Sequence, residues 1–172
     1  DGSGQASYFF NYEDFVNDYK DEFDLHDFTS QVMFPNEWDE YIDFAAGLIN
    51  MDLSGLKIVV DTANGAASTT AERVFSKLNT KPIMIHNIPD GININQGCGS
   101  THMEDLRQAV ITNKADIGIA FDGDADRMLA VDEAGNMVEG DQIMAVCGLF
   151  MKEQGKLKQD TITATVMSNL GF

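Results

Sequence analysis

The feature that most constrains the fold is an uninterrupted apolar run, Ile117–Phe121, in the second half of the chain. A strand with one face in solvent alternates apolar and polar residues, whereas this run carries no polar side chain. It therefore predicts a short strand that is buried on both faces. A chain built around such a strand must cover both faces of its sheet, and helices are the usual cover.

Apolar patterns on either side of this run alternate between strand and helix. Short β-branched or apolar runs predict strands, and apolar residues that recur every three or four positions predict helices. The predicted strands are 57–61, 82–86, 117–121, 128–132, 136–138 and 161–164, and the predicted helices are 67–78, 101–113 and 141–152, after a helical apolar face that begins at Trp38. This alternation predicts an α/β fold, a three-layer α/β/α domain with a mostly parallel mixed sheet.

Polar residues at the predicted element ends give more local predictions. Ser100 or Thr101 could cap the helix over 101–113. Residues 133–135 are expected to close a hairpin, with Asp132 in its turn. The residues Glu139–Asp141 are expected at the start of the last helix, where the Asp141 charge suits the helix dipole.

Charge narrows the classes of partner. The 172 residues include 28 acidic residues and 11 Lys and Arg, for a formal charge of −17. This excess argues against electrostatic binding to nucleic acid or to an anionic membrane surface, because both need a basic face. The first fifty residues hold twelve acidic residues and one Lys, or −11, which leaves −6 for the other 122. The part with the strand and helix pattern is therefore only mildly acidic.

Cysteine usage and targeting patterns point to a reducing compartment. Cys98 and Cys147 form no C-x-x-C pair, so neither a zinc site nor a disulfide framework is expected. No apolar stretch approaches the roughly 20 residues of a membrane span, and no secretory leader is apparent. The expected location is the cytoplasm. The first residue is Asp1 and not Met, which favours a fragment or a processed chain.

The start of the chain is an acidic, aromatic-rich leader, 1–37, that the sequence leaves unassigned. Phe15, Tyr19 and Phe23 share one helical stripe at four-residue spacing. A short helix docking on the domain, or a disordered acidic leader, accounts for this stripe better than a partner-binding motif, because such stripes are common. We expect the folded domain to extend over 38–160.

Three carboxylates follow the buried strand at every second position: Asp122, Asp124 and Asp126. In an extended or looping backbone their side chains can converge on one point, where they repel one another unless a cation neutralises them. Mg²⁺ takes oxygen ligands and commonly leaves positions for water or a phosphate. Arg127 supplies a planar guanidinium that suits a phosphate oxyanion. The sequence thus predicts a Mg²⁺ site beside a phosphate.

Other interpretations of this loop stay open. An EF-hand-like calcium loop would use the same three aspartates and Glu133 at position twelve, but Arg127 stands where that motif needs Gly. A phosphatase-type D-x-D loop would make Asp122 a nucleophile and leave the third carboxylate without a role. An unrelated cation site and simple solvated charge remain as further alternatives.

Other polar candidates give weaker predictions. Residues 64–68 could offer backbone N–H groups to a phosphate, although their Gly and Ala also suit a tight turn, which we favour. The loop 90–100 is long, polar and glycine-rich. His102 follows it and could carry a proton, but a histidine at a helix start is more often a surface residue. His26 and His86 have no companions at ligand spacing.

Several segments carry a likeness to a known family: residues 53–67, 90–95 with 98–101, 122–127, 140–141 and 165–172. From Trp38 onward the chain resembles the α-D-phosphohexomutases, and within them most closely the bacterial phosphoglucosamine mutases. The segment 122–127 is similar to the metal-binding loop of the family. Residues 161–172 look like the first strand of a following domain, cut short at Phe172.

The resemblance implies that this chain is the second of four domains. Such an enzyme holds its transferred phosphoryl group on a serine of a Thr-Ala-Ser-His-Asn-Pro-like loop in the first domain, and no such run occurs in this chain. The sugar-binding and phosphate-gripping loops of the later domains would lie beyond Phe172. The resemblance therefore implies no catalytic residue in this chain and a Mg²⁺ ion held by Asp122, Asp124 and Asp126. It leaves two roles open for Arg127, which would either contact a phosphate or order the loop.

For function, the resemblance implies a phosphohexomutase that interconverts glucosamine 6-phosphate and glucosamine 1-phosphate through a phosphoserine. This chain would supply the metal-binding loop and would be inactive alone. The alternatives are a domain of a phosphomannomutase or phosphoglucomutase, because sugar choice belongs largely to another domain, or a non-catalytic module that binds a divalent cation. The expected partner is a phosphosugar, with no nucleic acid and no membrane.

Overall fold

The computed structural model describes residues 37–49, 51–166 and 168. The predicted leader, apart from residue 37, and His26 lie outside these residues. Contacts divide the chain into two units, 1–40 and 41–172, and the fold described here is that of the second unit. No helix in the described ranges is long and apolar enough to span a membrane.

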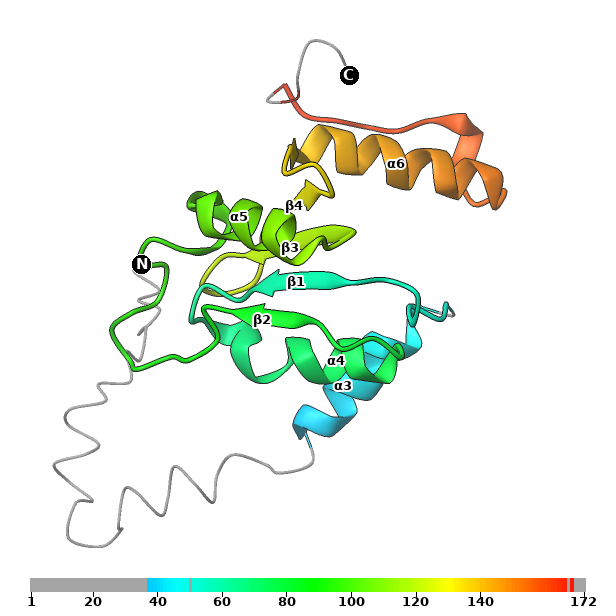
Figure 1. Cartoon of the computed structure of the whole chain (residues 1–172). Coiled ribbons are helices and arrows are strands. Elements are labelled where there is room, and N and C mark those ends of the chain that lie inside the picture. The colour runs from blue at the N-terminus through cyan, green and yellow to red at the C-terminus, as the bar shows by residue number, and fades with distance from the viewer. Residues whose placement is uncertain (1–36, 50, 167, 169–172) are drawn as a thin grey trace, which may run out of the picture. The chain divides into compact units, whose positions relative to one another are not determined.

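The second unit is built on one sheet (Figure 1). Its strands are β1 (Ile58–Asp61), β2 (Ile83–Ile85), β3 (Ile117–Phe121), β4 (Met128–Asp132) and β5 (Met137–Val138), and the helices are α3 (Glu37–Gly47, which begins in the first unit), α4 (Ala71–Lys77), α5 (Glu104–Asn113) and α6 (Gly140–Glu153). Short 3₁₀ turns occur at η1 (Ala66–Thr69), η2 (Gly99–Thr101) and η3 (Lys158–Asp160).

The sheet is mixed, with strand order β2-β1-β3-β4-β5. The strands β2, β1 and β3 are parallel, and Val59 pairs with Ile83 on one side and Gly118 on the other. The next strand, β4, is antiparallel to β3, with Met128 opposite Phe121, and β5 is antiparallel to β4. The predicted α/β fold with a mixed sheet is confirmed, and its parallel part brings the ends of β1, β2 and β3 to one edge.

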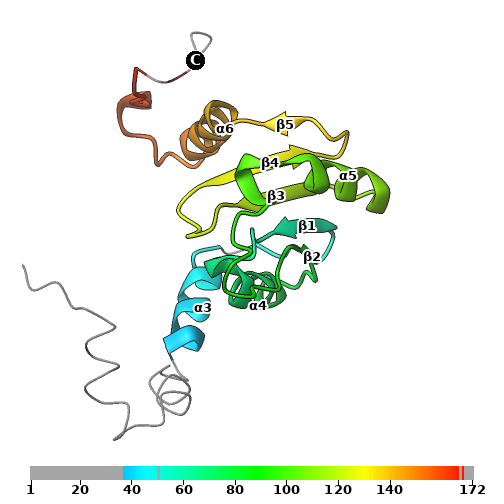
Figure 2. The same cartoon turned by 90° about the vertical axis from the view of Figure 1, so that its left-hand side faces the viewer.

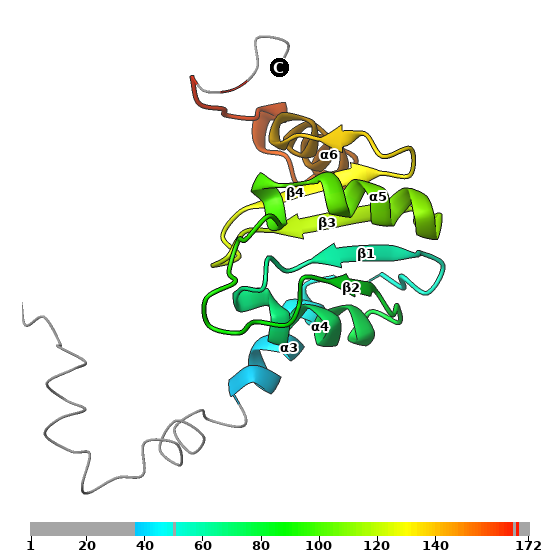
Figure 3. The ribbon, with the colours of Figure 1, turned by 60° about the vertical axis from the view of Figure 1, so that its left-hand side comes forward.

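Each face of the sheet has its own apolar core, and Figure 3 shows α5 and α4 on opposite sides of the strands. On one face Leu106 and Val110 of α5 pack with Val59, Ala120 and Val131. A side chain at Gly118 would lie 2.6 Å from Val110, so glycine lets α5 lie close against β3. The other face packs against η1 and α4, with these buried residues: Ile58, Val60, Ala67 and Ala71.

The last helix, α6, lies beside β5 (Figure 2). Its start is a capping box in which Glu139 and Gln142 exchange side-chain to backbone hydrogen bonds. The predicted helix start at Glu139–Asp141 is therefore confirmed, with Asp141 in the first turn. An apolar pocket of about 410 Å³ separates part of α6 from the sheet, and Ile119, Val138 and Val146 contribute to its lining.

The prediction of a strand over 161–164 is wrong, since these residues, all of which the structure describes, form no strand. This segment follows η3 and approaches α6, where Ile162 contacts the position of Gly148. A strand requires hydrogen bonds to a neighbouring strand, and residues 161–164 pair with no strand of the described sheet. The proposed start of a following domain at this point stays a prediction.

Two helix starts also differ from the predictions. The helix predicted over 67–78 is divided at Thr70 into η1 and α4. The helix predicted from Thr101 begins at Glu104, and its N-cap is Met103, without a side-chain cap. The predicted cap by Ser100 or Thr101 is therefore wrong, because η2 turns the chain there and the Thr101 hydroxyl bonds to Nδ1 of His102.

Candidate metal centre

The loop that carries the three aspartates, Asp122–Arg127, joins β3 to the antiparallel β4. Its ends are close, because the Asp122 N–H donates to the Arg127 carbonyl oxygen at 3.3 Å. Ala125 has a left-handed backbone with φ of 61°, which turns the chain in the middle of the loop. The loop is thus a hairpin connection anchored in the sheet at both ends.

The three aspartates converge as predicted. One carboxylate oxygen each from Asp122, Asp124 and Asp126 lies within 4.8 Å of the other two. Asp122 is buried, whereas Asp124 and Asp126 are exposed. Two carboxylates therefore face solvent above a buried third, an arrangement that would leave room for water or a phosphate oxygen on a cation held there.

Arg127 holds the buried aspartate in place. Its backbone N–H donates to Oδ1 of Asp122 at 3.1 Å, and its Nε donates to Oδ2 at 2.7 Å. A second ion pair joins Nε to Oδ1 of Asp126 at 3.4 Å. The Arg127 side chain is 76% exposed. In this structure it orders the loop, and its exposure leaves it accessible to an anion.

The charges of the loop explain why a cation would fit. The charge of Asp124, followed by burial and the charge of Asp122, raises the pKa of Asp126. Burial opposes ionisation of Asp122, but the hydrogen bonds from the Arg127 backbone and guanidinium outweigh it and lower the pKa of Asp122. Three oxygen donors under mutual repulsion suit a hard divalent cation such as Mg²⁺.

The position of Glu133 argues against an EF-hand arrangement. Glu133 follows β4, and a strand of this length spans roughly 16 Å at about 3.3 Å per residue. The twelfth position of an EF-hand loop must instead return to the same ion. The loop also lies between two strands and not between two helices.

The turn after β1 packs directly on the loop Asp122–Arg127. The N–H of Ala66 donates to the Gly123 carbonyl oxygen at 2.8 Å, and a Cβ on Gly65 would lie 2.1 Å from that oxygen. The N–H groups of Asn64 and Gly65 donate to the carbonyl oxygens of His86 and Thr62. Since these donors are used within the fold, the structure supports the tight-turn interpretation of residues 64–68 over phosphate binding.

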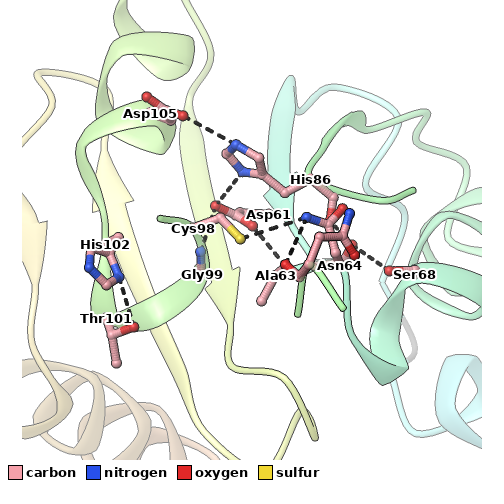
Figure 4. Close-up of polar contacts among 12 residues, drawn as sticks. Asp61, Ala63, Asn64, Ser68, His86, Cys98, Gly99, Thr101, His102 and Asp105 are labelled. Atoms are coloured by element: carbon pink, nitrogen blue, oxygen red, sulfur yellow. Dashed lines mark hydrogen bonds and ion pairs between the residues drawn. The ribbon is translucent and has the colours of Figure 1, made fainter. Parts of the chain in front are cut away.

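A second polar cluster lies at the same edge of the sheet (Figure 4). The carboxylate of Asp61, at the end of β1, is fully buried and accepts hydrogen bonds from the N–H groups of Ala63 and Gly99 at 2.8 and 3.0 Å. His86 lies between two carboxylates, with Nδ1 2.9 Å from Asp61 and Nε2 3.2 Å from Asp105. The Sγ atom of Cys98 lies within 4.8 Å of the Asp61 and His86 ligand atoms.

Sequence reasoning missed this cluster, because it found no companions for His86. Its partners are distant in sequence, with Asp61 25 residues away. The available clue was the position of Asp61 and His86 at the ends of two neighbouring parallel strands, where side chains meet. Burial, followed by the charges of Asp61 and Asp105, raises the pKa of the Cys98 thiol.

The remaining candidates have local roles in the structure. His102 is exposed and contacts Thr101, in line with a surface residue. Asp132 belongs to the hairpin turn, as predicted, and accepts hydrogen bonds from the N–H groups of Ala134 and Asn136 and from the Asn136 side chain. Cys147 is an exposed free thiol.

Comparison with known proteins gives the family. Residues 39–135 match the family model described as phosphoglucomutase/phosphomannomutase, alpha/beta/alpha domain II. Over 134 residues the chain is 58% identical to the phosphoglucosamine mutase of Acetivibrio thermocellus and 53% identical to that of Clostridium novyi. Each match covers 78% of this chain and 30% of the relative, so the chain spans under a third of the length of these relatives.

Solved structures of known proteins share the fold of this chain. A phosphoglucomutase/phosphomannomutase family protein of Burkholderia thailandensis is 28% identical, with a TM-score of 0.58 over 68% of this chain and 26% of its own. A putative phosphomannomutase of Thermus thermophilus, 20% identical with a TM-score of 0.56 over 67% of this chain and 29% of its own, shares the fold. The chain therefore belongs to the phosphoglucomutase/phosphomannomutase family and carries its α/β/α domain II.

Proposed function

We propose that this domain supplies the Mg²⁺-binding loop of a phosphoglucosamine mutase. The observation that carries the proposal is the convergence of Asp122, Asp124 and Asp126 within 4.8 Å, on a loop fixed at both ends by strands. The relatives at 53–58% identity are named phosphoglucosamine mutases. The glucosamine branch is therefore favoured over the other phosphohexomutases.

In the proposed enzyme, glucosamine 6-phosphate and glucosamine 1-phosphate are interconverted through a phosphoserine on another domain. A bound Mg²⁺ would neutralise charge on the transferred phosphoryl group. Asp122, Asp124 and Asp126 would hold the ion, and Arg127 would keep Asp122 oriented through the two hydrogen bonds described above. The exposed part of the guanidinium would contact a phosphate oxygen.

The proposed distribution of roles among domains rests on the share of each relative that this chain covers. The chain matches about 30% of each relative, and we propose that the phosphoserine and the sugar-binding groups belong to the other domains. The chain alone would then bind metal without turning over substrate.

The free thiols of Cys98 and Cys147 support the proposed cytoplasmic location, because disulfides are rare there.

The test is a calorimetric Mg²⁺ titration of the chain and of two variants. Asp124→Asn removes one exposed ligand and should weaken Mg²⁺ binding without lowering the melting temperature of the metal-free chain, because it relieves like-charge repulsion. Glu133→Gln is the matched control, since it removes one carboxylate from the far end of β4 and should leave binding unchanged.

Glucosamine 6-phosphate turnover is measured in the same preparations. No turnover by the chain, with turnover by the full-length enzyme that Asp124→Asn reduces, is the expected result. Equal Mg²⁺ binding by wild type and Asp124→Asn would contradict the metal assignment. Metal binding by the chain together with an inactive full-length protein would support a non-catalytic cation-binding module instead.

A further inference from the structure

We propose that Asp61, His86 and Cys98 form a second metal site, selective for a thiophilic divalent cation such as Zn²⁺. The three residues each offer one ligand atom, and these atoms lie within 4.8 Å of one another. Figure 4 shows the three side chains directed toward one another from β1, from the end of β2 and from the loop before η2. This site is separate from the loop Asp122–Arg127 and does not depend on the function proposed above.

The donor set determines the class of cation. Sulfur, imidazole nitrogen and carboxylate oxygen are the three ligand types that Zn²⁺ takes in proteins. Mg²⁺ favours oxygen alone, so the two sites of this domain would select different metals. Zinc sites with three protein ligands keep a fourth position for water or another small ligand, and the partly exposed His86 side chain, at 25%, marks the side from which solvent reaches the cluster.

The backbone around the cluster is built to bring these side chains together. Asp61 pairs with Ile85 in the parallel ladder, so His86 emerges one residue beyond it. His86 itself adopts a left-handed backbone with φ of 47°. A residue other than glycine in this region is uncommon, and such residues gather at functional sites. Cys98 is brought in by the loop after β2, where Gly99 at φ of 73° allows the backbone to contact Ala63 and the Phe121 carbonyl oxygen.

The groups around the ligands match the outer shell of a zinc site. A metal-bound histidine usually donates its other ring N–H to a carboxylate, which fixes the ring and raises its basicity. His86 has this arrangement, because its Nδ1 lies 2.9 Å from Asp61 while its Nε2 lies 3.2 Å from Asp105. The Asp61 carboxylate is likewise held by the N–H groups of Ala63 and Gly99.

Binding requires only proton movements and small shifts. In the metal-free structure Nδ1 of His86 and Oδ2 of Asp61 share a hydrogen bond of 2.9 Å. For a metal to bind, the ring proton would move by way of water from Nδ1 to Nε2, where it faces Asp105, and the Cys98 thiol would release its proton to water, which frees Nδ1 and the thiolate as ligands. The Asn64 Nδ2 group, 3.8 Å from Sγ, can donate to the resulting thiolate.

The experiment uses Co²⁺ as a spectroscopic probe in place of Zn²⁺. The chain carries Asp124→Asn so that the carboxylate loop contributes little to the signal. We expect one Co²⁺ per chain with a thiolate-to-cobalt charge-transfer band, displaced by Zn²⁺. The band should be absent in Cys98→Ser and retained in the matched control Cys147→Ser, which removes the exposed thiol.

A second variant separates metal binding from folding. Asp105 is 66% exposed, so Asp105→Asn should leave the fold intact. Loss of this outer-shell carboxylate should weaken Zn²⁺ binding about 10- to 100-fold. The proposal is overturned if the band is absent from the parent chain, persists in Cys98→Ser or requires Cys147, or if Asp105→Asn binds Zn²⁺ as tightly as its parent. None of these results bears on Mg²⁺ binding at the aspartate loop.

Discussion

At the scale of single residues, the edge of the sheet depends on glycines that let loops touch. Gly65 and Gly123 face one another at the contact between the turn after β1 and the loop Asp122–Arg127. A Cβ on Gly123 would also lie 2.6 Å from Nδ2 of Asn95, so three segments meet there. The positions of the three aspartates are thus determined partly by residues that carry no carboxylate.

This contact gives a prediction for Gly65→Ala. The added methyl would lie 2.1 Å from the Gly123 oxygen, so the loop Asp122–Arg127 must move. We expect a loss of about 1–3 kcal/mol in the free energy of unfolding, as for other overpacked sites, and weaker Mg²⁺ binding, measured by denaturant unfolding and calorimetry. The control is Gly55→Ala, where nothing lies within 4 Å. Wild-type stability and Mg²⁺ affinity in Gly65→Ala would refute this account.

At the scale of elements, the β4–β5 hairpin is closed by one aspartate. Asp132 accepts hydrogen bonds from the Asn136 side chain at 3.0 Å and from the N–H groups of Asn136 and Ala134 at 2.7 and 3.0 Å. These bonds, those of Asn136 first, lower the pKa of Asp132 below its usual 3.8. The ionised carboxylate is therefore the form that the folded hairpin stabilises.

The hairpin gives a prediction for pH dependence. Because the folded pKa of Asp132 is lowered, its contribution to stability is complete above pH 3.8 and is lost as pH falls through the folded value. We expect Asp132→Asn to melt at a lower temperature than wild type at neutral pH, with the difference closing in strong acid. Circular dichroism measures both.

Glu133→Gln is the control for the hairpin, because it removes a charge from the same turn and leaves the Asp132 bonds in place. A difference between wild type and Asp132→Asn that stays constant from neutral to acid pH would show that the charge of Asp132 is not what stabilises the turn.

The elements differ in how well the sequence predicts them. The strand over Ile117–Phe121 and the strand over Met128–Asp132 match their predicted bounds, because a short apolar run between polar loops has few other solutions. The predicted helix starts were wrong where hydrogen bonds between distant segments determine the turn. One example is Gly99, whose N–H donates to the buried Asp61 carboxylate. The prediction of a strand over 161–164 was wrong because strand formation depends on pairing with a second strand, which the local sequence pattern does not reveal.

The same contrast applies to the two polar sites. Asp122, Asp124 and Asp126 were predictable because one loop carries all three, so spacing alone brings them together. The cluster of Asp61, His86 and Cys98 was not, because its members come from three segments. Only the pairing of β1 with β2 places the first two side by side.

At the scale of the whole molecule, the formal charge of −17 opposes compactness. The first fifty residues carry a net charge of −11, and the other 122 carry a net charge of −6. Repulsion between exposed charges extends over a distance that salt shortens, from about 30 Å at 0.01 M to about 10 Å at 0.1 M ionic strength. Stability of the chain should therefore depend on salt.

We expect the melting temperature to rise by a few degrees as NaCl increases across this range. KCl at equal ionic strength should have the same effect, because screening depends on charge and concentration and not on the identity of a monovalent cation. Differential scanning calorimetry without divalent metal measures the change. A melting temperature that falls or stays constant would indicate that attractive ion pairs, such as Lys152 with Asp160, outweigh the repulsion.

The hairpin that carries the loop Asp122–Arg127 has a consequence for protein engineering. The pairing of Phe121 with Met128 closes the sheet immediately before and after Asp122–Arg127, so these six residues form a cassette. Exchanging the cassette for another six-residue segment with different donor atoms would leave the strand register unchanged. The domain is thus a scaffold on which the donor atoms at this edge of the sheet can be changed by transplanting one loop, provided that the residue at position 123 stays glycine.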